Sequence, residues 1–65
     1  MKSSELINLG PRIRKERRSK GISQSDFSKN LGISASYLNL LENGRRTLTV
    51  PLLIKIGNEL NLSLK

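Results

Sequence analysis

The sequence QSDFSKNLGISASYLNLL, residues 24–41, contains the pattern that decides the fold. Apolar side chains recur at helical spacing on both sides of a glycine, Gly32, which can adopt the left-handed turn conformation that other residues resist. The apolar set is Phe27, Leu31, Ile33, Leu38 and Leu41. The pattern predicts two short helices joined by a tight turn, with this apolar set facing a common core.

Hydroxyl side chains stand where the helices of this chain are expected to begin. Ser23 is the predicted N-cap of a helix over residues 24–31, and Asp26 adds a weaker relative of the capping box. Ser34 is the predicted cap of the next helix, which runs to about residue 42. Thr49, followed by Pro51 in the first turn, indicates a further helix that ends at residue 61. The apolar stripe predicted for that helix is Leu52, Leu53, Ile54, Ile56 and Leu60.

The N-terminal part of the chain predicts one more helix. Asn8 can cap it, Gly10 and Pro11 are tolerated in its first turn, and Gly21 ends it. Residues 1–7 are expected to be a tail or a helix extension. At the other end, residues 62–64 look like the start of another element with Ser63 as its cap.

The composition excludes most enzyme chemistry. The 65 residues contain no cysteine and no histidine, which removes disulfides, thiolate nucleophiles, imidazole catalysis and the usual zinc ligands. The five acidic residues show no spacing that suggests a catalytic pair. We therefore expect a single domain without enzymatic activity, cofactor or metal.

The charge of the chain points to a polyanionic partner. Lysine and arginine number 12 against five acidic residues, a formal charge of +7, and six of the basic residues fall within residues 12–20. A basic run of this kind can also be a solvated helix face. However, the face of the 34–42 helix opposite its apolar side carries small, amide and exposed apolar groups, which suit the major groove of DNA.

No apolar run approaches the roughly 20 residues that span a bilayer, and residues 1–10 lack the apolar core of a secretory signal. The expected location is cytoplasmic, at the nucleoid through DNA binding, with no membrane partner. A cationic membrane-surface helix is disfavoured because five glycines interrupt the chain.

Four short motifs carry a family resemblance: KGISQ at 20–24, LGIS at 31–34, SYL at 36–38 and LENGR at 41–45. With them the chain strongly resembles the Cro/cI-type (XRE family) helix-turn-helix DNA-binding domain. It is also similar, more narrowly, to the N-terminal domain of regulators grouped as short-chain fatty-acyl-related transcriptional regulators. The resemblance implies an all-α, compact, lambda-repressor-like bundle of four to five helices, with a central helix-turn-helix and a domain over residues 8–65.

The resemblance also implies roles for individual residues. Those at base-reading positions are Ser34, Ala35, Ser36, Asn39 and Leu40. Those at positions that contact DNA phosphates are Gln24, Tyr37, Asn43, Arg45 and Arg46. Arg17 and Glu42 match a pair that bonds the first helix to the end of the recognition helix, so both are expected to be structural. The remaining basic residues of the first helix are expected to act mainly through long-range attraction.

Two positions have a second interpretation, and a third departs from the family pattern. Leu40 either contacts a thymine methyl group or packs on the start of the next helix. Tyr37 either reaches a phosphate with its hydroxyl or only covers the margin of the core. Ser28 stands where the family usually has alanine, and its hydroxyl can bond back to a backbone carbonyl.

The function implied is sequence-specific binding of a double-stranded DNA operator by a bacterial or phage transcription regulator. Two copies would bind as a homodimer on half-sites about one helical turn apart. The alternative is a protein-interaction module of an antitoxin or regulatory complex in which DNA binding is secondary.

Overall fold

The chain folds into short helices joined by tight connections. The computed structural model describes residues 9–61, and within that range it contains four helices: α2 (Leu9–Ser19), α3 (Gln24–Leu31), α4 (Ala35–Glu42) and α5 (Val50–Leu60). The bounds of α3 agree with the prediction, whereas α2 ends at Ser19 and the turn through Gly21 follows it. The predicted cap at Asn8, the tail over 1–7 and the element with Ser63 as its cap lie outside the described residues.

The predicted helix caps are confirmed by their hydrogen bonds. The backbone N–H of Asp26 donates to Ser23 Oγ at 3.0 Å, and the N–H of Tyr37 donates to Ser34 Oγ at 3.0 Å. The N–H of Leu52 donates to the hydroxyl of the third cap, Thr49, at 3.4 Å. Each cap satisfies a backbone donor that has no partner within its own helix. The starts of α3, α4 and α5 are therefore set by local sequence.

The turn between α3 and α4 is built on a left-handed glycine. Gly32 has φ +74°, its N–H donates to the Lys29 carbonyl at 3.1 Å, and the N–H of Ile33 donates to the Ser28 carbonyl at 3.0 Å. This pair of bonds closes the end of α3 as a Schellman motif. From α5, the Lys55 ammonium donates to the Leu31 carbonyl at 3.3 Å. Two parts of the chain thus cover the carbonyl end of α3.

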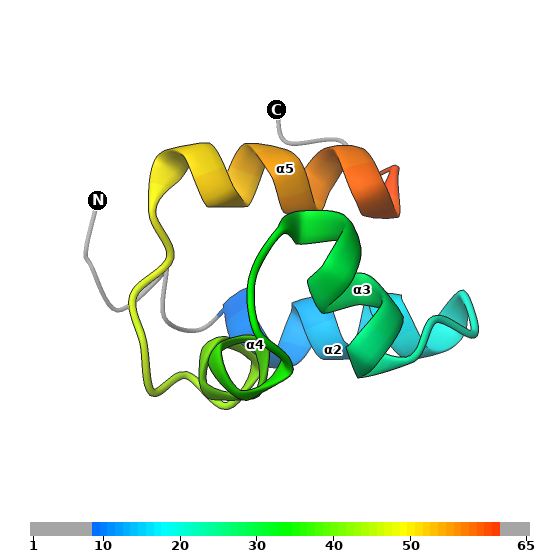
Figure 1. Cartoon of the computed structure of the whole chain (residues 1–65), viewed down its shortest axis with the longest axis horizontal. Coiled ribbons are helices and arrows are strands. Elements are labelled where there is room, and N and C mark those ends of the chain that lie inside the picture. Colours follow the sequence, from blue (N-terminus) through cyan, green and yellow to red (C-terminus); the bar gives the residue numbers. More distant parts are fainter. Residues whose placement is uncertain (1–8, 62–65) are drawn as a thin grey trace.

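Figure 1 shows α5 along the top of the molecule, α2 along the bottom and α3 between them, with α4 seen end-on at the lower left. Helix α4 packs against both α2 and α3, and α5 packs against α3 and α2. As a result α4 is supported from two sides by helices that precede it in the sequence.

The core is apolar and spans all four described helices. The predicted core residue Phe27 is fully buried, and Leu38 and Leu60 are buried with it. Leu48, in the connection before α5, is also buried, although its position in a loop gave no periodic signal. The place of Ile54 in the α5 stripe was wrong: its side chain is 50% exposed, because a stripe that buries Leu52, Ile56 and Leu60 turns position 54 outward.

Two small residues permit close packing of the helices. A Cβ atom added to Gly10 would lie 2.2 Å from the Leu41 carbonyl oxygen and 2.9 Å from that of Glu42, so the start of α2 touches the backbone at the end of α4. The tolerance of glycine in a first turn, on which the prediction was based, is therefore not its main role here. Ser28 is buried and its hydroxyl donates to the Ser25 carbonyl at 2.8 Å, as predicted.

Among residues 9–61, no helix has the length and apolar character required to cross a membrane.

Candidate nucleic-acid interface

Helix α4 has one buried side and one exposed side. Leu38, Leu41 and Glu42 are buried in contact with the rest of the domain. On the exposed side lie Ser36 and Asn39. The complete set of predicted base-reading residues that the structure exposes is Ser34, Ala35, Ser36 and Asn39. The helix is therefore held by one side and free to contact another molecule with the other.

Leu40 lies at the margin of this exposed side. Its side chain is half-buried, and it is not among the apolar residues that pack on the core cluster. The fraction that remains open leaves it able to touch an apolar group of a ligand.

The buried end of α4 is fixed by an ion pair with α2. The Arg17 guanidinium donates from Nε to Glu42 Oε2 at 2.7 Å and from Nη2 to Oε1 at 3.0 Å, and its Nη1 donates to the Ile22 carbonyl at 2.8 Å. Glu42 is fully buried and Arg17 is 6% exposed. The two-point geometry satisfies both charges, which is what allows them to be buried together. The contact predicted from the family pattern is thus present.

The ion pair shifts both pKa values in the direction that favours the charged forms. Burial alone would raise the pKa of Glu42, but hydrogen bonds and the charge of Arg17, with further hydrogen bonds from Gln24 and Arg14, outweigh it and lower that pKa. The hydrogen bond to Glu42 raises the pKa of Arg17. The buried carboxylate is therefore ionised at neutral pH.

Gln24, the first residue of α3, connects this ion pair to the exposed side of α4. Its Nε2 group donates to Glu42 Oε1 at 3.2 Å and to Asn39 Oδ1 at 3.3 Å. The two N–H groups of the amide thus have two acceptors within the protein. A DNA phosphate that binds this side chain, as the family pattern predicts, would have to displace one of them.

A second cross-helix contact involves Arg14, one turn before Arg17 on the same face of α2. Its Nε lies 3.4 Å from Glu42 Oε1, and its Nη2 donates to Asn43 Oδ1. This contact was not predicted, since the expectation for this arginine was only long-range attraction. The spacing of three residues from Arg17 was the signal that could have indicated it. Because Asn43 Oδ1 accepts this bond, the donors of the Asn43 amide are left for other partners.

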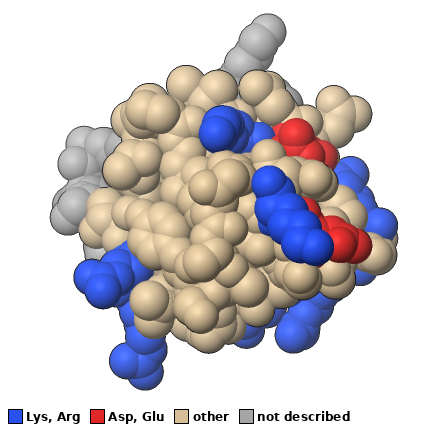
Figure 2. Space-filling view, in the orientation of Figure 1, with Lys and Arg blue, Asp and Glu red and all other residues tan. Residues whose placement is uncertain are grey.

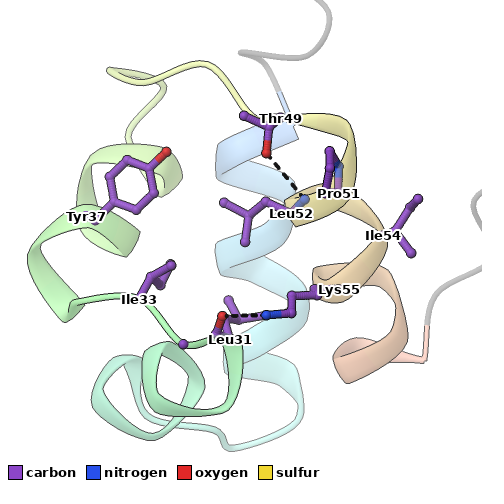
Figure 3. Close-up of a pocket in the computed structure, with 9 residues that line it drawn as sticks. Leu31, Ile33, Tyr37, Thr49, Pro51, Leu52, Ile54 and Lys55 are labelled. Atoms are coloured by element: carbon purple, nitrogen blue, oxygen red, sulfur yellow. Dashed lines mark hydrogen bonds between the residues drawn. The ribbon is translucent and has the colours of Figure 1, made fainter.

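Tyr37 lines an open, mainly apolar groove between the helix-turn-helix and the start of α5. The groove has a volume of about 640 Å³ and is also lined by Ile33 and Leu52. Figure 3 shows the tyrosine ring on one side of the groove, with Leu52, Pro51 and Ile54 of α5 on the other. The ring is partly buried against the core, which the packing interpretation expected. The phosphate contact of its hydroxyl stays a prediction.

Arg45 and Arg46 follow α4 directly and are both exposed. The backbone N–H of Arg45 donates to the Leu40 carbonyl at 2.8 Å, so the start of this basic segment is tied to the last turn of α4. Figure 2 shows basic side chains projecting from the lower edge of the molecule on both sides, with a largely uncharged surface between them. Such a distribution suits a polyanion that spans the molecule.

These features define a helix-turn-helix domain, and comparison with known proteins agrees. The chain belongs to the helix-turn-helix family of the Cro/cI (XRE) type, whose model, described as Helix-turn-helix (HTH_3), matches residues 13–65. The family predicted from the sequence motifs is thereby confirmed.

Curated relatives include both long and short proteins. The chain is 41% identical over 54 residues to the HTH-type transcriptional regulator PrpR of Mycobacterium tuberculosis, a match that covers 83% of this chain and 11% of PrpR. It is 38% identical over 56 residues to the ImmF control region 10 kDa protein of Bacillus phage phi105, covering 86% and 62% of the two chains. It is 41% identical over 54 residues to the uncharacterized HTH-type transcriptional regulator YazB of Bacillus subtilis, covering 83% and 78% of the two chains. The chain thus spans only a small part of the length of PrpR.

Solved structures share the fold. The restriction-modification controller protein C.AhdI of Aeromonas hydrophila superimposes with a TM-score of 0.82 at 28% identity, over 94% of this chain and 88% of that one. The clp gene regulator ClgR of Corynebacterium glutamicum gives a TM-score of 0.79 at 25% identity, over 97% and 65%. The all-α helix-turn-helix architecture is therefore confirmed.

Proposed function

We propose that this chain is the sequence-specific DNA-binding domain of a bacterial or phage transcription regulator, with α4 as the helix that enters the major groove. One observation carries the proposal: α4 exposes Ser36 and Asn39 while Leu38 and Leu41 on its other side are buried. A single α-helix with short outward side chains fits the major groove. The relatives named as transcriptional regulators support the same function.

In this proposal the exposed residues of α4 contact base edges, and phosphate contacts fix the position of the helix. The base contacts come from Ser34, Ala35, Ser36, Asn39 and Leu40. The phosphate contacts come from Gln24 and the backbone N–H groups beside it at the start of α3, and from Tyr37, Asn43, Arg45 and Arg46. Arg17 and Glu42 are buried, so in this proposal they hold the end of α4 against α2 and do not contact DNA.

The proposed binding unit is a homodimer on cytoplasmic DNA. Two copies on a two-fold symmetric operator would place two α4 helices in successive major grooves, with half-sites about one helical turn apart.

Selection of preferred duplexes from a random library tests the proposal directly. We expect enrichment of one short sequence, repeated at a spacing of about 10 base pairs. Replacing Ala35, Ser36 or Asn39 should change which bases are preferred, by about 1 to 3 kcal/mol for each good base contact. A library that emerges without any preferred sequence would overturn the assignment of α4 as a reading helix.

The phosphate contacts predict a specific salt response. Arg45→Ala or Arg46→Ala should weaken binding to all duplexes about equally and reduce the log-log slope of affinity against salt by about 1 for each phosphate that is no longer neutralised. Fluorescence anisotropy between about 50 and 200 mM salt measures this slope. Lys29→Ala is a matched control because it also removes one exposed positive charge. Lys29 lies in the last turn of α3, whereas the phosphate contact proposed for α3 is at its first residue, Gln24. An equal slope change in the control would refute a contact role for the two arginines.

A further inference from the structure

The charge of Glu42 determines which atoms of the neighbouring side chains donate hydrogen bonds and which accept them. An ionised carboxylate only accepts hydrogen bonds, and Arg17 keeps Glu42 ionised through two bonds. The end of the Gln24 amide that lies 3.2 Å from Glu42 must therefore be its NH₂ group. An inverted amide would place two acceptor oxygens against each other in a partly buried site.

The polarity of Gln24 in turn sets that of Asn39 on the exposed side of α4. The NH₂ group of Gln24 also lies 3.3 Å from the Asn39 side chain, so the atom of Asn39 that faces it must be the acceptor Oδ1. The Nδ2 group of Asn39 then lies on the side away from Gln24. Because Asn39 is exposed, those two N–H donors are available to a ligand.

We infer that Arg17, Glu42 and Gln24 form a positioning relay that fixes Asn39 as a donor toward DNA, and so determines the class of base that this residue accepts. The inference rests on the proposed function, since it concerns the reading of DNA by α4. In the major groove, purine N7, guanine O6 and thymine O4 are acceptors, whereas cytosine presents only the N4 donor. Asn39 Nδ2 therefore finds an acceptor on guanine, adenine or thymine, and cytosine offers it none.

Because the relay uses both N–H groups of the Gln24 amide, a phosphate at this position would be bound by the backbone N–H groups at the start of α3, and the Gln24 side chain has a different role. A side chain that only binds phosphate contributes equally to every duplex. A side chain that orients Asn39 contributes to discrimination at one base position and leaves the others unchanged. The two roles therefore have different effects on binding. Loss of a phosphate contact weakens binding to every duplex equally, whereas loss of the orienting bond changes the base preference only at the position that Asn39 contacts.

Duplex selection with the full chain and a Gln24→Ala variant separates these roles. We expect the variant to lose discrimination against cytosine at the Asn39 position by roughly fivefold or more, since a good base contact is worth that much or more. Preferences at the other positions should be retained. Ser25→Ala, an exposed neighbour in the same turn, is the matched control and should leave the base preference unchanged at every position. Circular dichroism confirms that each variant folds.

A double-mutant cycle tests whether Gln24 acts through Asn39. In an Asn39→Ala background, Gln24→Ala should cause no further change at that base position, because the group that it orients is gone.

A readout without DNA keeps the relay separate from the proposed function. The readout is the NMR chemical shift of the side-chain NH₂ groups in the free protein. The Gln24 NH₂ resonances should be shifted by their two acceptors. In Gln24→Ala, the Asn39 NH₂ resonances should move toward those of a free asparagine. If wild-type protein selects no sequence, the proposed function fails. If it selects one and Gln24→Ala weakens all duplexes uniformly, or leaves the Asn39 signals in place, the relay is overturned.

Discussion

At the scale of single residues, the contact between Arg17 and Glu42 links positions 25 apart in sequence and brings two charges into the interior. Removing one charge leaves the other buried without a partner, which costs far more than the pair itself contributes. Glu42→Gln should therefore lower the free energy of unfolding by about 3 kcal/mol. Urea denaturation measures it, with the exposed Glu59→Gln as control. Equal effects of the two substitutions would contradict a structural role for Glu42.

The lowered pKa of Glu42 predicts a response to acid. The folded protein releases the Glu42 proton more readily than the unfolded chain does, so this group stabilises the fold above its unfolded pKa of about 4.3. That stabilisation is lost as the pH falls below about 4 toward the lower folded pKa. Thermal denaturation from pH 7 to pH 2 should show a decrease in Tm in this acidic range. The decrease should be smaller in Glu42→Gln, and an equal decrease in both proteins would exclude Glu42 as its source.

At the scale of secondary-structure elements, the backbone contact between α2 and α4 depends on the absence of one side chain. A methyl group at Gly10 would meet the Leu41 carbonyl oxygen, so Gly10→Ala must move α2 away from α4. The expected loss of stability is about 1 to 3 kcal/mol, as for other overpacked sites. Arg12→Ala, an exposed change in the same helix, should have little effect. Chemical denaturation of both variants compares them, and a stabilised Gly10→Ala would show that the close approach is not required.

The helices also show which structural features can be predicted from the sequence alone. The caps at Ser23, Ser34 and Thr49 were predictable because a cap needs only local residues. The exposed position of Ile54 follows from helical periodicity, whereas the burial of Leu48 in a loop depends on how the helices pack. The same holds for the site: the exposed face of α4 followed from periodicity, whereas the bonds of Gln24 and Arg14 to Glu42 depend on the packing of three helices.

At the scale of the whole molecule, a domain of 65 residues has little stability in reserve, on the order of 3 to 10 kcal/mol. Leu48 contributes to that reserve from a loop, where it is 3% exposed. Leu48→Ala should cost about 2 to 5 kcal/mol, enough to unfold much of the protein near 37 °C. Calorimetry measures the change in Tm, and Ile54→Ala is the control because its side chain is half exposed. A negligible change in Leu48→Ala would show that the loop does not contribute to the core.

Some residues on the exposed side of α4 also form hydrogen bonds within the protein, and others do not. Ser34 caps the helix and Asn39 is bonded to Gln24, so a change at either alters more than the surface. Ala35 and Ser36 are exposed and belong neither to a described cap nor to the core. Under the proposed function, new operator preferences would evolve, or be engineered, first at these two positions, because substitutions there do not compete with folding.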